Sequence, residues 1–566
     1  MNTVNFSFLD YFFFGIVFVV SIVIGLYFAL KTKKQQSVDE YIFGGKNLGV
    51  VPVAFSLLAT CITGSATIGQ SMEVYAYGLH NFVYILMIPV WGSLTAFVFL
   101  PVFYDLQLMS SFTYLELRFD RSVKHIASAL YVITGLFIIP MTIYVPAISL
   151  QEVSGINLYV ICIVSGGLCI WYTAIGGFRA VVWTDVFQFL LLFFSVLVIF
   201  IVGLKSVGGF QNTWDALDRG GRLDIIRTDF NLETRGTIWA YFFSVIFTML
   251  FNMCLTQSSI QRFLSLSSYR KAKQAVLIQT FFCAVILILQ FVIGAVIYAT
   301  YEDCDPIKAG IVKKIDQLFP YFVQEKASLF PGFNGIFIAG TFSAGLSTTS
   351  TLLNTMSGTI YTDFLSDRFG NSSGRTVDRI MKINVAIIGV IGIALIFLIE
   401  RLGTIFVITV ICFTFSTVGV FGLFCNGMIF KNINSKGAKC GVIVSMIVVG
   451  ILIAGSLNKK PDPVLLLRTD GCDFLNTTSL INPSWSNSTE TKLNPNNEDL
   501  LWIFRINFQF FCIIGLIINF VVGSIVSFLT GGNTVEDQRL LLKFLRKDIP
   551  KETLLSQKTN VLHSEF

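Results

Sequence analysis

The chain has 566 residues, of which 54% are hydrophobic and only 13% are charged, and its mean hydropathy is +0.73. Soluble proteins carry about a quarter charged residues, so this composition excludes an ordinary soluble protein. The net charge of +6 is spread over short loops between long apolar runs, a pattern typical of an all-α polytopic membrane protein with no nucleic-acid partner.

Thirteen apolar segments are each long enough to cross the membrane as a helix, which requires about 20 residues for roughly 30 Å of hydrocarbon. The first is too long for a signal-peptide core and lacks a small-residue cleavage site, so we expect it to be retained. The segments lie near residues 10–30, 50–70, 82–104, 126–149, 156–176, 185–204, 238–260, 276–299, 332–359, 380–399, 403–425, 438–456 and 501–528.

Basic residues concentrate in the short loops on one side of these segments. "KTKKQQ" follows the first segment and "QRFLSLSSYRKAK" follows the seventh. Short basic loops remain in the cytoplasm. With an odd number of spans, we therefore expect an extracellular N-terminus and a cytoplasmic C-terminus, in a multi-pass protein of the plasma membrane.

Longer loops of mixed charge lie on the opposite side, at 205–237, 300–331 and 457–500. The last contains two glycosylation sequons, at Asn476 and Asn487. Cys304 and Cys472 lie in two of these loops and could form a disulfide, although two unrelated thiols are the alternative. The other cysteines accompany apolar runs, and the three histidines are far apart. We therefore expect neither an enzyme nor a metal centre other than sodium.

Three segments contain many polar residues. The seventh reads "IWAYFFSVIFTMLFNMCLTQSSIQRF" and contains Asn252, Thr256 and Gln257. The second reads "VPVAFSLLATCITGSATIGQSMEVYAYG" and the ninth contains "TFSAGLSTTSTLLNTMSGTIY". Glycine and hydroxyl residues at this density weaken a helix, and broken backbone at membrane depth must be buried in protein or line a cavity. Ordinary packing between helices is the alternative, because small and hydroxyl residues also serve that purpose in membranes.

The ninth segment offers a patch of oxygen ligands. Ser347 and Thr348 follow Ala344 by three and four residues, so both hydroxyls lie near its carbonyl on one helix face. Hard cations prefer oxygen ligands, and carbonyls of unwound helices hold sodium in transporters. The pattern therefore indicates a sodium site, completed by carbonyls of another, unwound segment.

Four stretches resemble the sodium/solute symporter family, in the branch of the monocarboxylate, multivitamin and iodide transporters. They are "AIGGFRAVVWTDVFQ", "SAGLSTTSTLLNTMS", "SLLATCITGSATIG" and "PVFYDLQLMSSFTYLELRF". The resemblance implies a LeuT-like core of two inverted five-helix repeats. The implied divisions are an extra helix with its loop at 1–49, repeats at 50–204 and 238–456, extracellular loops at 205–237 and 457–500, a last helix at 501–528 and a cytoplasmic tail at 529–566.

The family's sodium site implies carbonyl ligands at Ala59, Ile62 and Ala344 and hydroxyl ligands at Ser347 and Thr348. Asp185 matches an acidic residue beside the family's sodium path. The alternative for Asp185 is a structural role, as a partner of Arg179 or at the end of a span. The implied substrate pocket contains Ala66, Gln70, Thr142 and Tyr144.

The resemblance implies sodium-coupled symport of a monocarboxylate or related organic anion, without a cofactor. A multivitamin (biotin- or pantothenate-like) symporter and an inorganic anion symporter are alternatives, although the small residue at Ala66 disfavours iodide. "GQSMEVY" departs from the branch's usual Gly-Val-Pro pattern, which leaves the solute open. A channel or a non-transporting sensor on the same scaffold is a further alternative. The final residues Ser564, Glu565 and Phe566 fit the carboxyl-terminal pattern that PDZ domains bind.

Overall fold

The structure is a computed structural model that describes residues 6–32, 43–312, 315–327, 331–369, 372–399, 405–457, 459, 464–472, 500–532, 535 and 537–546. Asn476, Asn487 and the carboxyl-terminal Ser564, Glu565 and Phe566 lie outside the described residues. The described residues are almost entirely helical and contain no strand, only an isolated bridge between Arg227 and Thr237.

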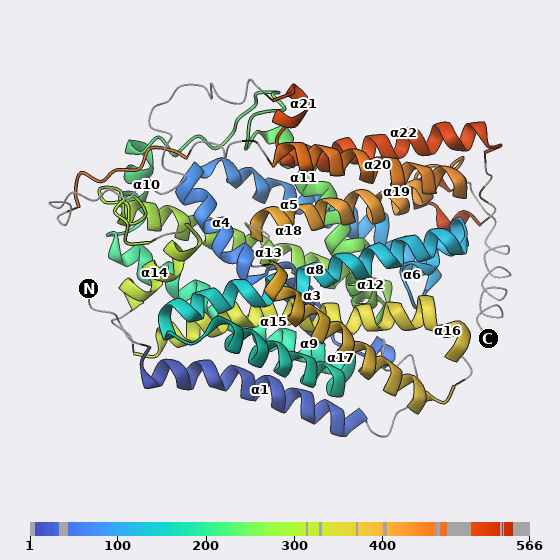
Figure 1. Cartoon of the computed structure of the whole chain (residues 1–566), viewed down its shortest axis with the longest axis horizontal. Coiled ribbons are helices and arrows are strands. Elements are labelled where there is room, and N and C mark those ends of the chain that lie inside the picture. The colour runs from blue at the N-terminus through green and yellow to red at the C-terminus, as the bar shows by residue number, and fades with distance from the viewer. Residues whose placement is uncertain are drawn as a thin grey trace.

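The helices run broadly side by side along the long axis of the molecule, with α1 at one edge and α22 at the opposite edge (Figure 1). The longer helices are α1 (Phe8–Thr32), α3 (Val50–Cys61), α4 (Gly64–Tyr77), α5 (Val83–Leu94), α8 (Arg121–Ser154), α9 (Leu158–Ser206), α10 (Phe210–Arg219), α11 (Ile238–Leu250), α13 (Tyr269–Thr300), α14 (Ile315–Ala327), α15 (Phe333–Ile360), α17 (Gly374–Ile399), α18 (Ile405–Ser416), α20 (Ser435–Ser456) and α22 (Phe511–Leu529).

Shorter helical elements connect or extend these. They are η1 (Gly44–Lys46), η2 (Leu79–Phe82), η3 (Thr95–Phe99), α6 (Leu100–Leu106), α7 (Thr113–Arg118), η4 (Phe251–Leu255), α12 (Gln257–Leu264), η5 (Tyr361–Leu365), α16 (Ser366–Phe369), η6 (Thr417–Phe421), α19 (Gly422–Met428), α21 (Trp502–Arg505), η7 (Phe508–Phe510), η8 (Gln538–Leu540) and η9 (Lys543–Leu545).

The helices account for all thirteen predicted segments. Among the described residues, eleven helices are long and apolar enough to span a membrane, and the bent pair α3 and α4 makes a twelfth. Helix α9 combines the fifth and sixth predicted segments. Gly177 interrupts it with φ 63° and ψ −166°, a conformation open essentially only to glycine. Counting the two parts of α9 separately gives the predicted number.

Several predicted boundaries differ from the structure; α13, for example, begins at Tyr269 and not near 276. The seventh apolar helix ends at Leu255 and not near 260, because Thr256 is extended and caps the separate helix α12. The last span begins at Phe508 and not at 501. Asn507 is extended there, and its backbone N–H donates to the carbonyl of Leu232 over 2.8 Å, which ends the short helix α21.

Helix α15 lies at the centre of the bundle. It packs against α9, α8, α1 and α3, and almost all of its residues are buried. Its glycines allow this close packing. A Cβ on Gly345 would clash with the carbonyl oxygen of Thr142 in α8. The hydroxyl-rich ninth segment is therefore a central core helix, which positions it for the site described next.

Candidate functional site

The second segment is broken where glycine and hydroxyl residues are densest. Helix α3 ends at Cys61, and α4 begins at Gly64 after a bend of 54°. Ile62 and Thr63 between them are extended, with ψ angles of 92° and 158°. The Thr63 hydroxyl caps α4 by accepting from the Ala66 N–H at 3.1 Å. This break frees carbonyl groups at the end of α3, as a cation site requires.

The break packs directly on α15. A Cβ on Gly64 would lie 2.6 Å from the Thr341 carbonyl oxygen, so no larger residue fits there without a shift of backbone. Two turns beyond Thr341 on α15, the Thr348 hydroxyl donates to the Ala344 carbonyl over 3.2 Å. Two of the expected sodium ligands are thus neighbours on α15, the helix on which the break packs. The geometry fits a small hard cation held by neutral oxygens.

All five expected sodium ligands are buried. Their exposed fractions are 1% for Ala59, 5% for Ile62, 2% for Ala344, 0% for Ser347 and 7% for Thr348. Burial strengthens the attraction between an ion and oxygen dipoles, because little water competes with them.

Asp185 is not the partner of Arg179. Arg179 donates to the Gly44 carbonyl over 2.8 Å, while Asp185 pairs with Arg262 of α12 over 2.8 Å. The side chains of Asp185 and Arg262 are 0% and 1% exposed. The structural alternative for Asp185 therefore named the wrong partner. The partner is Arg262, at the loop end of the seventh segment, and not Arg179 of the Gly-Gly motif.

Hydroxyl groups from two other helices complete this buried pair. Ser347 donates to Asp185 Oδ1 over 2.7 Å, and Ser56 donates to Oδ2 over 2.5 Å. Arg262 in turn donates to Ser56 Oγ over 2.7 Å and to Thr351 Oγ1 over 2.6 Å. We call these five residues the Asp185–Arg262 network. It joins α3, α9, α12 and α15, and it brings a carboxylate to one expected sodium ligand.

Arg262 and Ser56 are the functional candidates that sequence reasoning missed. Arg262 lies in the basic stretch "QRFLSLSSYRKAK", where it was one of several charges that indicate a cytoplasmic loop. Its neighbours Gln257, Ser259 and Gln261 are buried as well. A run of buried polar residues directly after an apolar helix is the signal that could have singled it out.

The expected substrate residues fall into two groups. Ala66 and Gln70 are partly accessible on α4. Thr142 is turned toward α15, because its hydroxyl bonds Thr349 Oγ1 over 2.8 Å and the Ile139 carbonyl over 2.8 Å. Tyr144 lies on α8 and is 8% exposed. In this structure Thr142 therefore makes a helix-packing contact, whereas Ala66 and Gln70 are the partly accessible members of the set.

One face of α4 is accessible along its whole length. It contains Ala66, Gly69, Gln70, Glu73 and Tyr77, which we call the α4 stripe, and the residues between them are mostly buried. Their spacing matches one side of a helix. A Cβ on Gly69 would meet nothing within 4 Å. Charged and amide groups at membrane depth normally face water or a cavity, so the stripe indicates a polar approach to the helix break.

The far end of α4 is covered by residues 464–472, which we call the strap. Leu465 donates its backbone N–H to the Ala76 carbonyl over 3.0 Å, and Asp305 donates its own to the Arg468 carbonyl over 2.8 Å. A disulfide between Cys304 and Cys472 ties the strap to the end of α13. Cys304 and Cys472, which lie in two different long loops of the sequence, are therefore joined by a disulfide.

Buried polar groups also hold the strap against α4 and α13. Tyr75 donates to Asp305, and Arg222 stacks on the Tyr298 ring at 3.7 Å while donating to the carbonyls of Tyr75 and Leu466. Arg222 is 0% exposed, and burial lowers the pKa of its guanidinium. The strap is thus fixed to α4 by backbone and side-chain hydrogen bonds and to the end of α13 by the disulfide.

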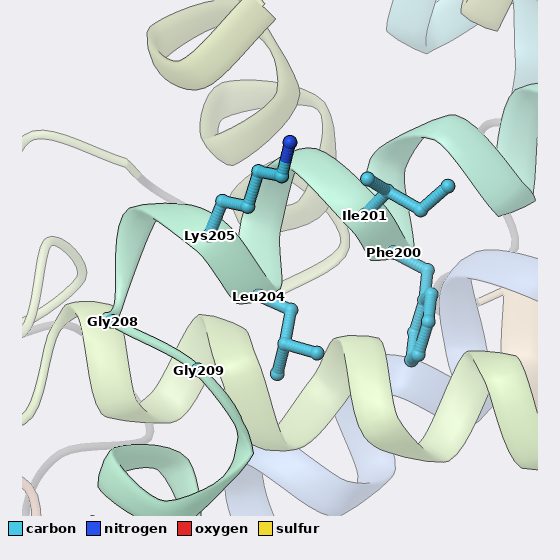
Figure 2. A pocket seen from close by; sticks show the side chains of 6 residues that line it. All are labelled: Phe200, Ile201, Leu204, Lys205, Gly208 and Gly209. Carbon is cyan, nitrogen blue, oxygen red and sulfur yellow. The ribbon is translucent and has the colours of Figure 1, made fainter.

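The hollow in Figure 2 lies at the carboxyl end of α9. Its lining is apolar apart from Lys205 and consists of Phe200, Ile201, Leu204, Lys205, Gly208 and Gly209. It contains none of the expected ligands. Among the described residues, no group of three or more His, Cys, Asp or Glu gathers in a way that could hold a metal ion.

The chain is similar to known transporters over nearly its whole length. It is 31% identical over 542 residues to sodium-coupled monocarboxylate transporter 2 of Mus musculus, covering 95% of this chain and 86% of that protein. It is 30% identical over 544 residues to the sodium-dependent multivitamin transporter of Oryctolagus cuniculus, covering 94% and 84%.

The fold matches a solved structure of a Na⁺-coupled sialic acid symporter with a TM-score of 0.73 at 22% identity, over 93% of this chain and 98% of that one. This likeness confirms the expected LeuT-like fold. The model of the sodium:solute symporter family matches residues 41–445. Together with the broken helix packed on a hydroxyl-rich core helix, this match shows that the chain belongs to the sodium:solute symporter family.

Proposed function

We propose that this protein couples the entry of sodium to the uptake of a small organic anion, a monocarboxylate or a related carboxylate, by alternating access. Sodium is the coupling ion of the family, whose members are transporters and not enzymes. The observation that carries the proposal is the break at Ile62 and Thr63, packed on α15, the helix in which the Thr348 hydroxyl meets the Ala344 carbonyl. The choice of solute draws on the relatives named as monocarboxylate transporters.

In this mechanism sodium is a cargo held by the carbonyls of Ala59, Ile62 and Ala344 and the hydroxyls of Ser347 and Thr348. Binding there ties the broken helix to α15 and prepares the α4 stripe for the solute. When the Asp185–Arg262 network opens, sodium leaves past Asp185. One sodium ion and one monocarboxylate together carry no net charge, so the inward sodium concentration gradient drives the solute, at about 1.4 kcal/mol for each tenfold difference in sodium concentration.

We further propose that α4 and the strap face the outside of the plasma membrane and that α12 faces the cytoplasm. A disulfide persists in an oxidising compartment, which favours an extracellular position for Cys304 and Cys472. Basic loops favour a cytoplasmic position for the opposite end. The N-terminus is then extracellular and the C-terminus cytoplasmic. Glycosylation at Asn476 and Asn487 and a PDZ partner for Ser564, Glu565 and Phe566 are part of the same proposal.

The test measures uptake of labelled lactate, pantothenate, biotin and iodide by cells expressing the chain, with sodium replaced by choline in a parallel arm. We expect saturable, sodium-dependent uptake of at least one carboxylate. Uptake of pantothenate or biotin in place of lactate would favour a multivitamin symporter. Uptake of iodide alone would favour an inorganic anion symporter. Sodium flux that does not saturate and needs no solute would favour a channel, and sodium binding without flux a sensor.

The double variant Ser347→Ala, Thr348→Ala tests the sodium site. Each lost hydrogen bond or ligand oxygen at a charged group is worth about 1.5–3 kcal/mol, so we expect the sodium concentration for half-maximal uptake to rise at least tenfold. Thr341→Ala is the matched control on α15, because its hydroxyl bonds only the Ile338 carbonyl in its own helix. Unchanged sodium dependence in the double variant would refute this site.

A further inference from the structure

The α4 stripe ends at a cation from a distant part of the chain. Arg235, in the segment before α11, pairs with Glu73 over 2.6 Å. The two side chains are 17% and 19% exposed, so the pair is accessible from the same side as the rest of the stripe. Glu73 lies one helical turn beyond Gln70 and two turns beyond Ala66. The pair therefore stands at the entrance to the residues expected to meet the solute.

Aromatic rings hold the guanidinium of Arg235 in place. Its Cζ lies 4.3 Å from the centroid of the Tyr77 ring and 5.7 Å from that of Phe508. Tyr77 is the last member of the α4 stripe, one turn beyond Glu73. A guanidinium lying over a ring directs its N–H edges away from the ring, where they can donate to anions. Stacking thus orients Arg235 whether or not Glu73 occupies those edges.

Arginine suits the recognition of a carboxylate. Its planar fork presents parallel N–H groups that match the two oxygens of a carboxylate. Glu73 already shows that a carboxylate fits at this position. The side chains of the pair are 17% and 19% exposed, so an anion can reach them, and a solute carboxylate that replaces Glu73 leaves Arg235 with a carboxylate partner.

We propose that Arg235 is an entry site for the carboxylate group of the solute and that the solute binds there by displacing Glu73. The inference rests on the proposed function and adds the residue that first selects the anion. The displaced Glu73 is released toward water, and the solute moves on along Gln70 to Ala66. Arg222 also contacts α4, but it is 0% exposed and donates to backbone carbonyls, so a solute does not reach it.

The test compares three variants by the KM for uptake of labelled lactate, or of labelled biotin if lactate is not transported. Arg235→Gln loses the charge, and we expect its KM to rise about tenfold, the loss of roughly one charge-assisted hydrogen bond. Arg235→Lys keeps the charge without the fork, so its KM should be intermediate. Glu73→Gln removes the competing carboxylate, and we expect its KM to fall.

Two readouts separate an entry site from a structural role. Sodium half-saturation at saturating solute should stay unchanged in Arg235→Gln, and the protein at the cell surface is measured by biotinylation. Arg219→Gln is the matched control, since Arg219 pairs with Glu302 over 2.7 Å and is 58% exposed. We expect its KM to equal that of the wild type.

The outcomes distinguish this inference from the proposed function. If the wild type takes up no carboxylate, both the proposed function and the entry site are refuted. If it takes up a carboxylate but Arg235→Gln and Glu73→Gln leave the KM unchanged, only the entry site is overturned. A KM that rises equally in Glu73→Gln and Arg235→Gln would also overturn it, because the pair would then serve the fold and not the anion.

Discussion

The two halves of the broken helix are held in different ways. Helix α3 is anchored through Ser56 in the Asp185–Arg262 network, whose ion pair is at most 1% exposed. Helix α4 is tied at its far end to the strap and the Cys304–Cys472 disulfide, while its stripe stays accessible and its ion pair with Arg235 is 17% and 19% exposed. Helix α3 is therefore anchored by a fully buried ion pair, whereas α4 keeps a polar face that is partly accessible to water.

This difference indicates which of the two ion pairs can exchange partners at a low cost in free energy. Removing one partner of a buried ion pair costs about 3–5 kcal/mol, because the other charge is left uncompensated. A solute carboxylate can replace Glu73 without leaving Arg235 uncompensated, while opening the Asp185–Arg262 network needs a compensating event. In the proposed mechanism sodium supplies it, because Ser347 is both a network member and an expected sodium ligand.

The largest expected effect is at the buried network. Arg262→Gln leaves Asp185 buried without its cation, and we expect a loss of about 3–5 kcal/mol of stability, measured as a fall in the thermal midpoint of the purified protein. Lys382→Gln is the matched control, since Lys382 pairs with Asp378 on the surface at 40% and 43% exposure. Equal midpoints for the two variants would remove the contrast between buried and exposed charge.

The strap is expected to contribute somewhat less. Cys304→Ser, Cys472→Ser and the double variant each remove a link between positions 168 residues apart, and disulfides typically contribute about 2–4 kcal/mol. We expect the three variants to lose stability equally, because each breaks the same bond. A double variant that is far less stable than either single variant would show that the thiols act separately, and the strap would then depend on its hydrogen bonds alone.

Two glycines in α4 provide the smallest and most closely matched comparison. Gly64→Ala places a Cβ 2.6 Å from the Thr341 carbonyl, and overpacking of this kind costs about 1–3 kcal/mol. Gly69→Ala meets nothing within 4 Å and should gain up to about 1 kcal/mol of helix stability. Thermal midpoints measure both, and sodium-dependent uptake should fall only in Gly64→Ala. Similar behaviour of the two variants would contradict the close packing of the break on α15.

Local sequence was sufficient for much of the architecture. Apolar length predicted the thirteen segments, since the membrane thickness sets the number of residues a helix needs. Glycine and hydroxyl density predicted the break in the second segment, which the structure places at Ile62 and Thr63. The fifth and sixth segments are adjacent in the sequence, but only the structure shows that they form one helix, which is interrupted at Gly177.

The partners of charged residues were not predictable in the same way. Asp185 and Arg262 are 77 positions apart, and Arg179 is much nearer in sequence but donates to Gly44. Glu73 and Arg235 lie even further apart along the chain. Arg262 was interpreted as one of several loop charges, because composition alone cannot distinguish a buried arginine from a hydrated one.

The sequence by itself determined that this chain is a polytopic membrane protein with a weakened second segment and an oxygen-rich ninth one, because hydrophobic length and helix propensity act over neighbouring residues. Tertiary structure alone decided which charges meet, which face of α4 stays accessible and that the strap closes over its end. These depend on helices far apart in the chain packing side by side, where contact distance and burial set the strength of each interaction.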